Sequence, residues 1–331
     1  MAKNWRTVIK EVFPHAEILD AALNYPISDT GWDISVPESP AQCTFQDPDY
    51  HLFVNLQDML TGKELINLNK HFVRGGFPLH RVTVLVWAKH IQASLPEHSV
   101  NVINFSSHQY ETWCSYSEHE QELRDAFHRD RKQFEYNFVC PQRIYKPHRA
   151  ALHRVLGSYV HANISLQSKG LELAYPSLTF KEYDASYDNC VNLLAMRKNY
   201  NTALFAIVSE SQYTQRYGII TEKTFNAIVA GVPFLLVAHR HALCDVNDYG
   251  FMSYPNLFNE SYDARDNQSR IKTMIEDNDS YIKGGLRADE MQSIYLDAQS
   301  IAEYNRNYFF DQFGDQLISE LRIDLLGIWG Q

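Results

Sequence analysis

Two apolar runs with an amphipathic segment between them place the strongest constraint on the fold. The first run, Ala203 to Val208, ends in Ser209-Glu210, and the second, Phe234 to Ala238, follows Gly231-Val232-Pro233. This order predicts a strand, a loop, a short helix and a strand, so that the two strands lie parallel in one sheet. A ligand of such a sheet is expected at the carboxyl ends of its strands.

Residues Thr221-Glu222-Lys223 open the predicted helix. Thr221 is predicted as the N-cap, which puts Glu222 and Lys223 in the first turn. Backbone N–H groups in a first turn lack intrahelical acceptors and attract anions. A lysine there adds a point charge for a phosphate, and a glutamate can accept hydrogen bonds from a ribose diol. The alternative interpretation is a capped amphipathic helix with an incidental Glu-Lys pair.

The segment Thr221-Glu222-Lys223-Thr224-Phe225, with Ala230-Gly231-Val232-Pro233-Phe234 after it, resembles the donor-binding signature of GT-B glycosyltransferases. The similarity is to the fucosyltransferase-like branch and its phage and bacterial relatives, and it covers roughly Phe134 to Ile275. It implies two facing Rossmann-like domains and a nucleotide-sugar donor. In this branch the ribose would be held by Glu222, and the diphosphate by Lys223 and by Arg143 or Arg149.

The expected donor site combines the helix start with cations that follow an upstream strand. Arginine can grip phosphate oxygens with two parallel bonds, lysine acts as a point charge, and positioned cations stabilise a departing nucleoside diphosphate. Arg143 and Arg149 are therefore also candidate catalytic residues. No metal and no further cofactor is expected, and a UDP-sugar is the favoured donor. The predicted donor-binding residues are Arg143, Lys146, Arg149, Thr221, Glu222, Lys223 and Thr224.

A candidate catalytic base follows the predicted strand Val100–Phe105. An inverting transferase needs a base that deprotonates the acceptor hydroxyl, and His108 or Glu111 would lie at the carboxyl end of this strand. The alternative is that both residues cap the next segment. Asp47, Asp49 and Asp58 are further carboxylates of this half, although Asp-Pro-Asp is more often a turn.

Alternation of strands and helices predicts an α/β chain with two parallel sheets. The expected GT-B domains are an acceptor-binding domain at 1–142, a nucleotide-sugar-binding domain at 143–312, and a C-terminal helix at 313–331 that crosses back onto the first domain. Strands are predicted at 51–55, 81–87, 100–105, 134–140, 162–166, 201–208 and 233–238. Helices are predicted at 62–72, 117–132, 147–156, 189–194, 222–230, 265–277 and 288–310.

Composition narrows the setting of the protein. The chain has 331 residues, and its apolar runs are all far shorter than the roughly 20 residues of a membrane-spanning helix. Its N-terminus does not resemble a secretory signal. Five scattered cysteines without a Cys-x-x-Cys indicate a reducing, cytoplasmic compartment, and His239 and His241 lack a further ligand at metal spacing. We expect no membrane partner.

Positive charge is concentrated in one segment of an acidic chain. The net charge is −10, yet Arg124 to Arg154 holds eight Lys/Arg and three Asp/Glu, a balance of +5. Such an island marks an anion site or a solvated helical face. Together with the resemblance to phage proteins, it favours a hydroxymethylated DNA base as acceptor. The alternatives are a glycan- or protein-directed transferase, and a nucleotide- or nucleic-acid-binding protein without turnover.

Overall fold

The computed structural model describes residues 4–21, 39–56, 62–87, 95–96, 99–127, 134–142, 146–159, 162–164, 189–214 and 218–329. They form two compact units. Unit 1 contains the described residues up to Glu111, Gly218 and Ile219, and the segment from Gly314 onward. Unit 2 contains the described residues from Thr112 to Gln215 and from Ile220 to Phe313. Each unit has a four-stranded parallel sheet, so the chain is an α/β protein.

The sheet of unit 1 has the strand order β1-β2-β3-β4. Its central strands are buried at every residue because parallel strands are covered on both faces. Asp20 in the edge strand β1 instead binds Arg6 and accepts a hydrogen bond from Asn55. The strands are β1 (Ala16–Ala21), β2 (His51–Leu56), β3 (Val82–Val86) and β4 (Asn101–Asn104).

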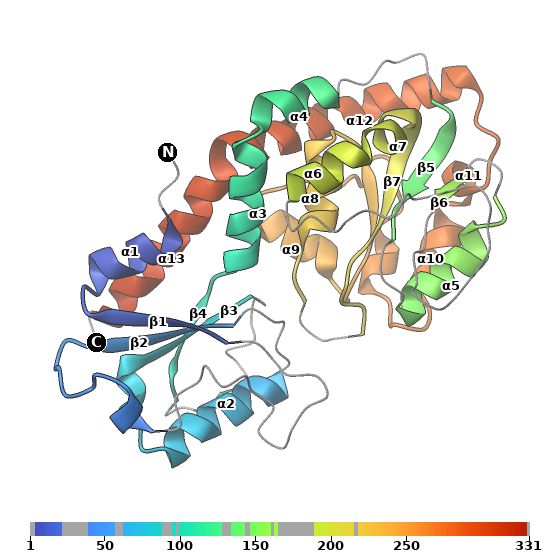
Figure 1. Cartoon of the computed structure of the whole chain (residues 1–331). Helices are drawn as coiled ribbons and strands as arrows, with labels where there is room; N and C mark the ends of the chain where they lie inside the picture. The colour runs from blue at the N-terminus through green and yellow to red at the C-terminus, as the bar shows by residue number, and fades with distance from the viewer. Residues whose placement is uncertain are drawn as a thin grey trace. The chain divides into compact units, whose positions relative to one another are not determined.

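Helices cover both faces of this sheet (Figure 1). Helix α2 (Gly62–Arg74) lies on one face, and α1 (Trp5–Val12) and α13 (Gly314–Trp329) lie on the other. The C-terminal helix α13 packs against α1 through an ion pair between Arg322 and Glu11 (2.5 Å) and an edge-on contact between Trp329 and Phe13. Short 3-10 turns lie at Pro40–Gln42 and Leu79–Arg81.

The sheet of unit 2 has the order β6-β5-β7-β8, which reverses direction beside β5. The chain runs from β5 outward to β6 and then returns to β7 on the other side of β5. In parallel α/β sheets this reversal opens a crevice at the carboxyl ends of the two strands concerned. The strands are β5 (Tyr136–Cys140), β6 (Ala162–Ile164), β7 (Ala203–Ser209) and β8 (Phe234–Val237).

Helices lie on both faces of this sheet. In Figure 1, α6, α7 and α8 lie on one side, and α5, α10 and α11 on the other. A π-helical turn at Phe309–Phe313 joins α12 to α13. The helices are α5 (Pro147–Leu156), α6 (Asn189–Ala195), α7 (Arg197–Thr202), α8 (Glu222–Val229), α9 (Ala242–Asp248), α10 (Arg270–Asp277), α11 (Asp279–Ile282) and α12 (Ala288–Tyr308), with a 3-10 turn at Ser261–Ala264.

The predicted helix 117–132 is confirmed only over Glu120–Ala126, and residues 128–132 lie outside the described residues. Ser117 ends a helix, α3 (Ser107–Ser117), and α4 (Glu120–Ala126) begins after a break at Glu118 and His119. Other predicted elements within the described residues are confirmed to within a few residues, and α5 has the predicted bounds. Helices α1, α3, α7, α9 and α11 and strand β1 were not predicted. Within the described residues, no helix is long and apolar enough to cross a membrane.

Candidate nucleotide-binding site of unit 2

Two helices begin beside the crevice where the strand order of unit 2 reverses. Helix α5 follows β5, and α8 follows β7 after an intervening loop. Because β5 and β7 are hydrogen-bonded neighbours, their carboxyl ends lie at the same edge of the sheet. Residues far apart in the sequence therefore meet at this edge, namely Lys146 to Arg149, Glu210, and Thr221 to Thr224.

Glu210 is the buried centre of the site. It follows β7 directly and has no exposed surface. One carboxylate oxygen, Oε1, accepts hydrogen bonds from the Thr221 backbone N–H (3.0 Å) and from the Thr224 hydroxyl (2.7 Å), and Oε2 accepts one from the Thr221 hydroxyl (2.5 Å). The carboxylate thus fixes the start of α8 to the end of β7.

Thr221 occupies the predicted N-cap position of α8, but its side chain does not cap the helix. Its hydroxyl donates to Glu210 instead of accepting from a backbone N–H of the first turn. The predicted N-cap position is confirmed. The hydroxyl donates to Glu210 and accepts from Lys223 Nζ (3.0 Å), and both are charge-assisted hydrogen bonds, which are the stronger ones.

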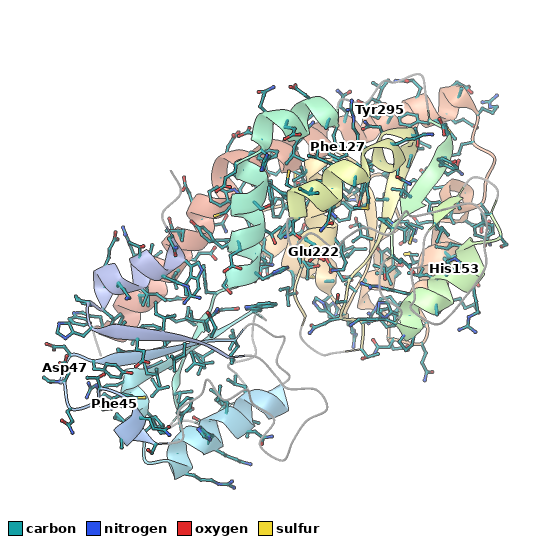
Figure 2. All side chains as sticks on the ribbon, in the orientation of Figure 1. Phe45, Asp47, Phe127, His153, Glu222 and Tyr295 are labelled. Atoms are coloured by element: carbon teal, nitrogen blue, oxygen red, sulfur yellow. The ribbon has the colours of Figure 1, made fainter. Side chains whose placement is uncertain are left out.

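Lys223 and Glu222 lie side by side in the first turn of α8. Lys223 Nζ is 2.5 Å from Glu222 Oε1, donates to the Thr221 hydroxyl (3.0 Å) and lies 3.9 Å from Glu210 Oε2. Both side chains keep about a quarter of their surface exposed, 26% for Lys223 and 28% for Glu222. Figure 2 labels Glu222 at the start of α8. The two side chains are accessible to a ligand, and Thr221 and Glu210 hold the ammonium group of Lys223 in place.

Helix α5 brings two further cations to this edge. Arg149 is 2% exposed and donates from Nη2 to the carbonyl oxygen of Ser209 (3.0 Å). Lys146 precedes the helix and is half-buried. Burial lowers the pKa of Lys146, and the nearby charges of Arg149 and Lys223 lower it further. Like charges are held together here, as expected for a site that binds an anion.

The cluster keeps a surplus of positive charge. Lys146, Arg149 and Lys223 contribute three positive charges, and Glu210 and Glu222 two negative ones, a balance of +1. Burial lowers the pKa of Arg149, whereas Glu210 and Glu222 raise it. The carboxylates prevent the buried arginine from becoming an uncompensated charge, and the surplus favours a bound phosphate.

His148 ties the start of α5 to the same strand end. Its Nε2 is 3.0 Å from the carbonyl oxygen of Glu210, and its ring stacks on Tyr213 with ring centres 4.9 Å apart. Burial is the main cause that lowers the pKa of His148 to about 4, and Arg149 and Lys146 add to it. At neutral pH the ring is therefore uncharged and donates a hydrogen bond to the carbonyl.

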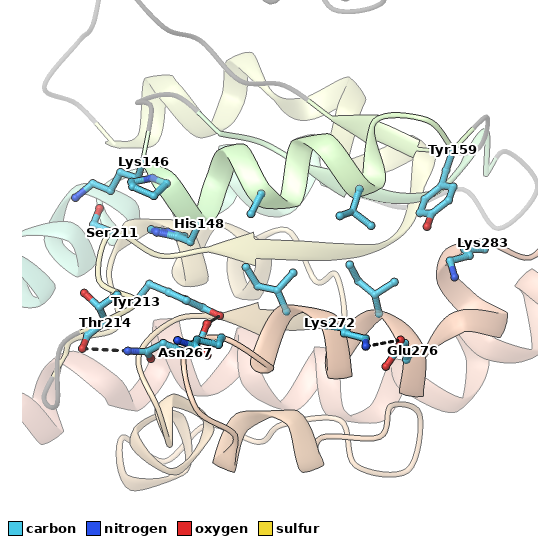
Figure 3. Close-up of a pocket in the computed structure, with 16 residues that line it drawn as sticks. Lys146, His148, Tyr159, Ser211, Tyr213, Thr214, Asn267, Lys272, Glu276 and Lys283 are labelled. Carbon is cyan, nitrogen blue, oxygen red and sulfur yellow. Dashed lines mark hydrogen bonds and ion pairs between the residues drawn. The ribbon is translucent and has the colours of Figure 1, made fainter.

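A pocket of about 670 Å³ opens beside this edge, between α5 and α10. Figure 3 shows Lys146, His148, Ser211 and Tyr213 at one end of the pocket and Tyr159 and Lys283 at the other. Its long wall is formed by aliphatic side chains of the two helices, Ala151, Val155, Ile271 and Ile275. Two buried polar atoms near the end of β7, Ser209 Oγ and Gln212 Oε1, have no hydrogen-bond partner among the described residues.

Six of the seven predicted donor-binding residues lie at this edge. They are Lys146, Arg149, Thr221, Glu222, Lys223 and Thr224. Arg143 lies outside the described residues, as does Asp58. Arg149 differs from expectation in its burial, because its guanidinium supports the end of β7 through Ser209.

The two candidate bases belong to unit 1. His108 and Glu111 lie in the first turns of α3, after β4, and their spacing of three places them on one helix face. His108 is partly buried and stacks on Trp87 with ring centres 5.3 Å apart, whereas Glu111 is exposed. Asp47 is bound to His15, and its backbone segment forms a turn with Asp49.

Sequence reasoning missed Glu210 and His148 as members of the site. The sequence did contain a signal for Glu210, because an acidic side chain directly after a buried, predominantly apolar strand does not contribute to apolar packing. His148 carried no such signal, since a histidine in a first turn is common. Both became recognisable only through their contacts with Thr221 and Tyr213.

The described members of the basic segment do not form one surface. Arg124 on α4 is paired with Glu120 and lies over Phe310, while Lys146, Arg149 and Arg154 belong to α5. Figure 1 shows α4 and α5 well apart in unit 2. The remaining four basic residues, Arg129, Arg131, Lys132 and Arg143, lie outside the described part of the chain.

Comparison of the chain with protein-family models, with curated proteins and with solved structures found no match. The assignment of a function therefore rests on the sequence pattern and on the geometry of unit 2.

Proposed function

We propose that the protein is a glycosyltransferase of the GT-B plan that binds a nucleotide sugar at the crevice between β5 and β7. The observation that carries the proposal is the convergence of Lys146, Arg149, Glu222 and Lys223 where the strand order reverses. Parallel α/β sheets bind nucleotides at such points, and helix starts with nearby cations bind their phosphates.

Each side chain has a definite task in this proposal. Lys223 and Lys146 hold the diphosphate, because both are cationic and partly accessible. Glu222 accepts hydrogen bonds from the ribose hydroxyls and exchanges its present partner, Lys223, for the ligand. Arg149, buried behind them, stabilises the charge that grows on the nucleoside diphosphate as the sugar–phosphate bond breaks. These cations take the place of a metal ion.

The proposed acceptor is a hydroxyl group, and the first to be tested is that of a hydroxymethylated DNA base. His108 and Glu111 are the proposed bases for its deprotonation. A flipped base would cost a few kcal/mol to extrude from a duplex. The separation of Arg124 from the cations of α5 leaves few phosphate contacts for DNA. Affinity for DNA should therefore fall shallowly with salt, with a slope of about −0.9 for each phosphate neutralised.

The first experiment measures donor binding. Thermal melting of the full chain is followed with UDP-, GDP-, CMP- and TDP-sugars, and a donor at about 100 times its Kd should add about 2.7 kcal/mol of stability. Glu222→Ala and Lys223→Ala are compared with Lys198→Ala, which replaces an exposed lysine of α7 that is not among the residues lining the pocket. The proposal requires a donor that protects wild type and the control but neither site variant. Equal protection of all four proteins would refute the site.

The second experiment measures transfer. Labelled sugar from the donor found above is offered to duplexes with and without hydroxymethylated bases, and to glycan and protein acceptors, in the presence of EDTA. Transfer to the modified duplex alone supports DNA as acceptor. Transfer to a glycan or protein replaces the DNA acceptor but retains the transferase. Dependence on added Mg²⁺ or Mn²⁺ would contradict the metal-independent mechanism.

A further inference from the structure

A second cluster of reactive side chains lies at the turn from β8 to α9, outside the groups used above. His241 immediately precedes α9, Cys244 lies in its first turn, and Asp263 comes from the 3-10 turn Ser261–Ala264. One ligand atom from each of the three, a ring nitrogen, the sulfur and a carboxylate oxygen, lies within 4.8 Å of the other two. Asp263 is too far from His241 and Cys244 in the sequence for the sequence alone to reveal the cluster.

We propose that His241, Cys244 and Asp263 bind a zinc ion. Zinc takes imidazole nitrogen, thiolate sulfur and carboxylate oxygen at about 2.0–2.3 Å in tetrahedral sites, which puts ligand atoms about 3.3–3.8 Å apart. The observed spacing needs to contract by about 1 Å. His241 and Cys244 are exposed and can rotate, whereas Asp263 is buried and fixed. Mixed N, S and O ligands favour zinc over the hard ions calcium and magnesium.

The fixed ligand is held in place by the turn itself. Asp263 Oδ1 accepts from the Ala242 N–H and Oδ2 from the Leu243 N–H, both at 3.1 Å, and its carbonyl oxygen accepts from the His241 N–H (3.0 Å). Each carboxylate oxygen retains a second lone pair for a metal. His241 is the one non-glycine residue with a positive φ (66°) among the described residues, and this backbone directs it into the turn.

Charge and a buried imidazole support a cation at this position. Asp245, Asp248 and Asp263 interact electrostatically with Cys244, and the guanidinium of Arg270 interacts with Asp263, so that three carboxylates face one guanidinium. His239, two residues before His241, is 3% exposed, binds Asp245 through Nε2 (2.8 Å) and interacts with Asp263. Its Nδ1 is buried and has no hydrogen-bond partner among the described residues.

The expected role is a clamp on the turn that joins β8 to α9. The metal would link α9 to the 3-10 turn that already caps it, and it would add free energy of folding because the unfolded chain has no preformed site. Removal of zinc should therefore lower the melting temperature and leave the proposed donor-binding residues intact. The inference does not depend on the proposed function.

Cobalt and zinc binding to the full chain tests this proposal. After metal is stripped, Co²⁺ is titrated and the cobalt–thiolate charge-transfer band is recorded, followed by displacement with Zn²⁺. We expect one Co²⁺ per chain, no band in Cys244→Ser, and an affinity loss in His241→Ala of more than the roughly 10–100-fold that loss of an outer-sphere partner costs. Cys43→Ser is the matched control, because Cys43 is a free cysteine of unit 1.

The outcomes separate cleanly. A saturable band in wild type and Cys43→Ser that disappears in Cys244→Ser, with a zinc-dependent rise in melting temperature, supports the site. No band in wild type, or a band that persists in Cys244→Ser, overturns it. Melting with the nucleotide sugar serves as the independent readout, since donor protection should be the same in Cys244→Ser and in wild type.

Discussion

Replacement of Glu210 tests the architecture of the candidate site most directly. The Glu210→Ala variant removes three hydrogen bonds that reach a carboxylate with no exposed surface. It also removes the negative charge that faces the buried Arg149. Hydrogen bonds to charged groups contribute about 1.5–3 kcal/mol each, and loss of one partner of a buried ion pair costs about 3–5 kcal/mol. Since these costs overlap, we expect a loss of about 3–5 kcal/mol in unfolding free energy.

Glu210→Gln separates charge from hydrogen bonding. The amide oxygen of glutamine can still accept from the Thr221 N–H and from the Thr224 hydroxyl, and the Thr221 hydroxyl can rotate to accept from the NH₂ group that replaces Oε2. Only the compensation of Arg149 and Lys223 is lost, so we expect an intermediate loss of about 1–3 kcal/mol. The matched control is Glu135→Ala, at an exposed position just before β5, which should change stability by less than about 0.5 kcal/mol.

The assay is urea unfolding of the intact chain followed by circular dichroism at pH 7. The loss of unfolding free energy should be smallest in Glu135→Ala, larger in Glu210→Gln and largest in Glu210→Ala. A loss below about 1 kcal/mol in Glu210→Ala would refute the reasoning, because a surface carboxylate behaves in that way. Equal losses in Glu210→Gln and Glu210→Ala would show that charge alone matters and that the threonine contacts contribute nothing.

Three further predictions concern the same edge of unit 2. Glu222→Ala should weaken nucleotide binding without a change in melting temperature of the free protein, because its side chain is partly exposed; calorimetric titration measures the first and a melting curve the second. Arg149→Ala should reduce kcat by about 10²–10³, and Arg149→Lys should recover part of it, because lysine restores the charge without the fork; equal rates in wild type and Arg149→Ala would contradict this role. The pKa of His148 is lowered to about 4, so the folded chain binds fewer protons than the unfolded chain between pH 4 and 6.5. The free energy of unfolding should therefore decrease as the pH is lowered through that window. From pH 7 to pH 5 its decrease in wild type should exceed its decrease in His148→Gln by about 2 kcal/mol, as measured by urea unfolding.

Elements that the sequence predicted well are those with an unambiguous local pattern. Strands β2, β3, β7 and β8 are predominantly apolar and buried throughout, as expected for parallel strands covered on both faces. Helix α5 is marked by Pro147 at its first residue. These signals lie within a few residues of the element itself, and tertiary contacts do not alter them.

Elements that were not predicted depend on partners far away in the chain. Strand β1 contains the charged residues Glu17 and Asp20, so its sequence does not show the apolar pattern of a buried strand. In the folded chain Glu17 accepts from Tyr50, and Asp20 binds Arg6 and Asn55. Helix α7 has the polar sequence Arg197–Thr202, and only Tyr200 is buried. A local pattern cannot reveal a strand or helix whose polar groups are satisfied in this way.

The candidate site shows the same division between local and non-local information. Glu222 and Lys223 could be found because both lie in one helical turn. Glu210 could not be assigned a role, because its role depends on strand order. The sequence of a strand does not determine which strand will lie beside it. In this sheet β5 lies between β6 and β7. That order brings the start of α5 to the end of β7, so that Arg149, 61 positions earlier in the chain, shares one buried edge with Glu210. Once the order is known, the carboxylate is required, because an arginine that is 2% exposed needs a compensating charge.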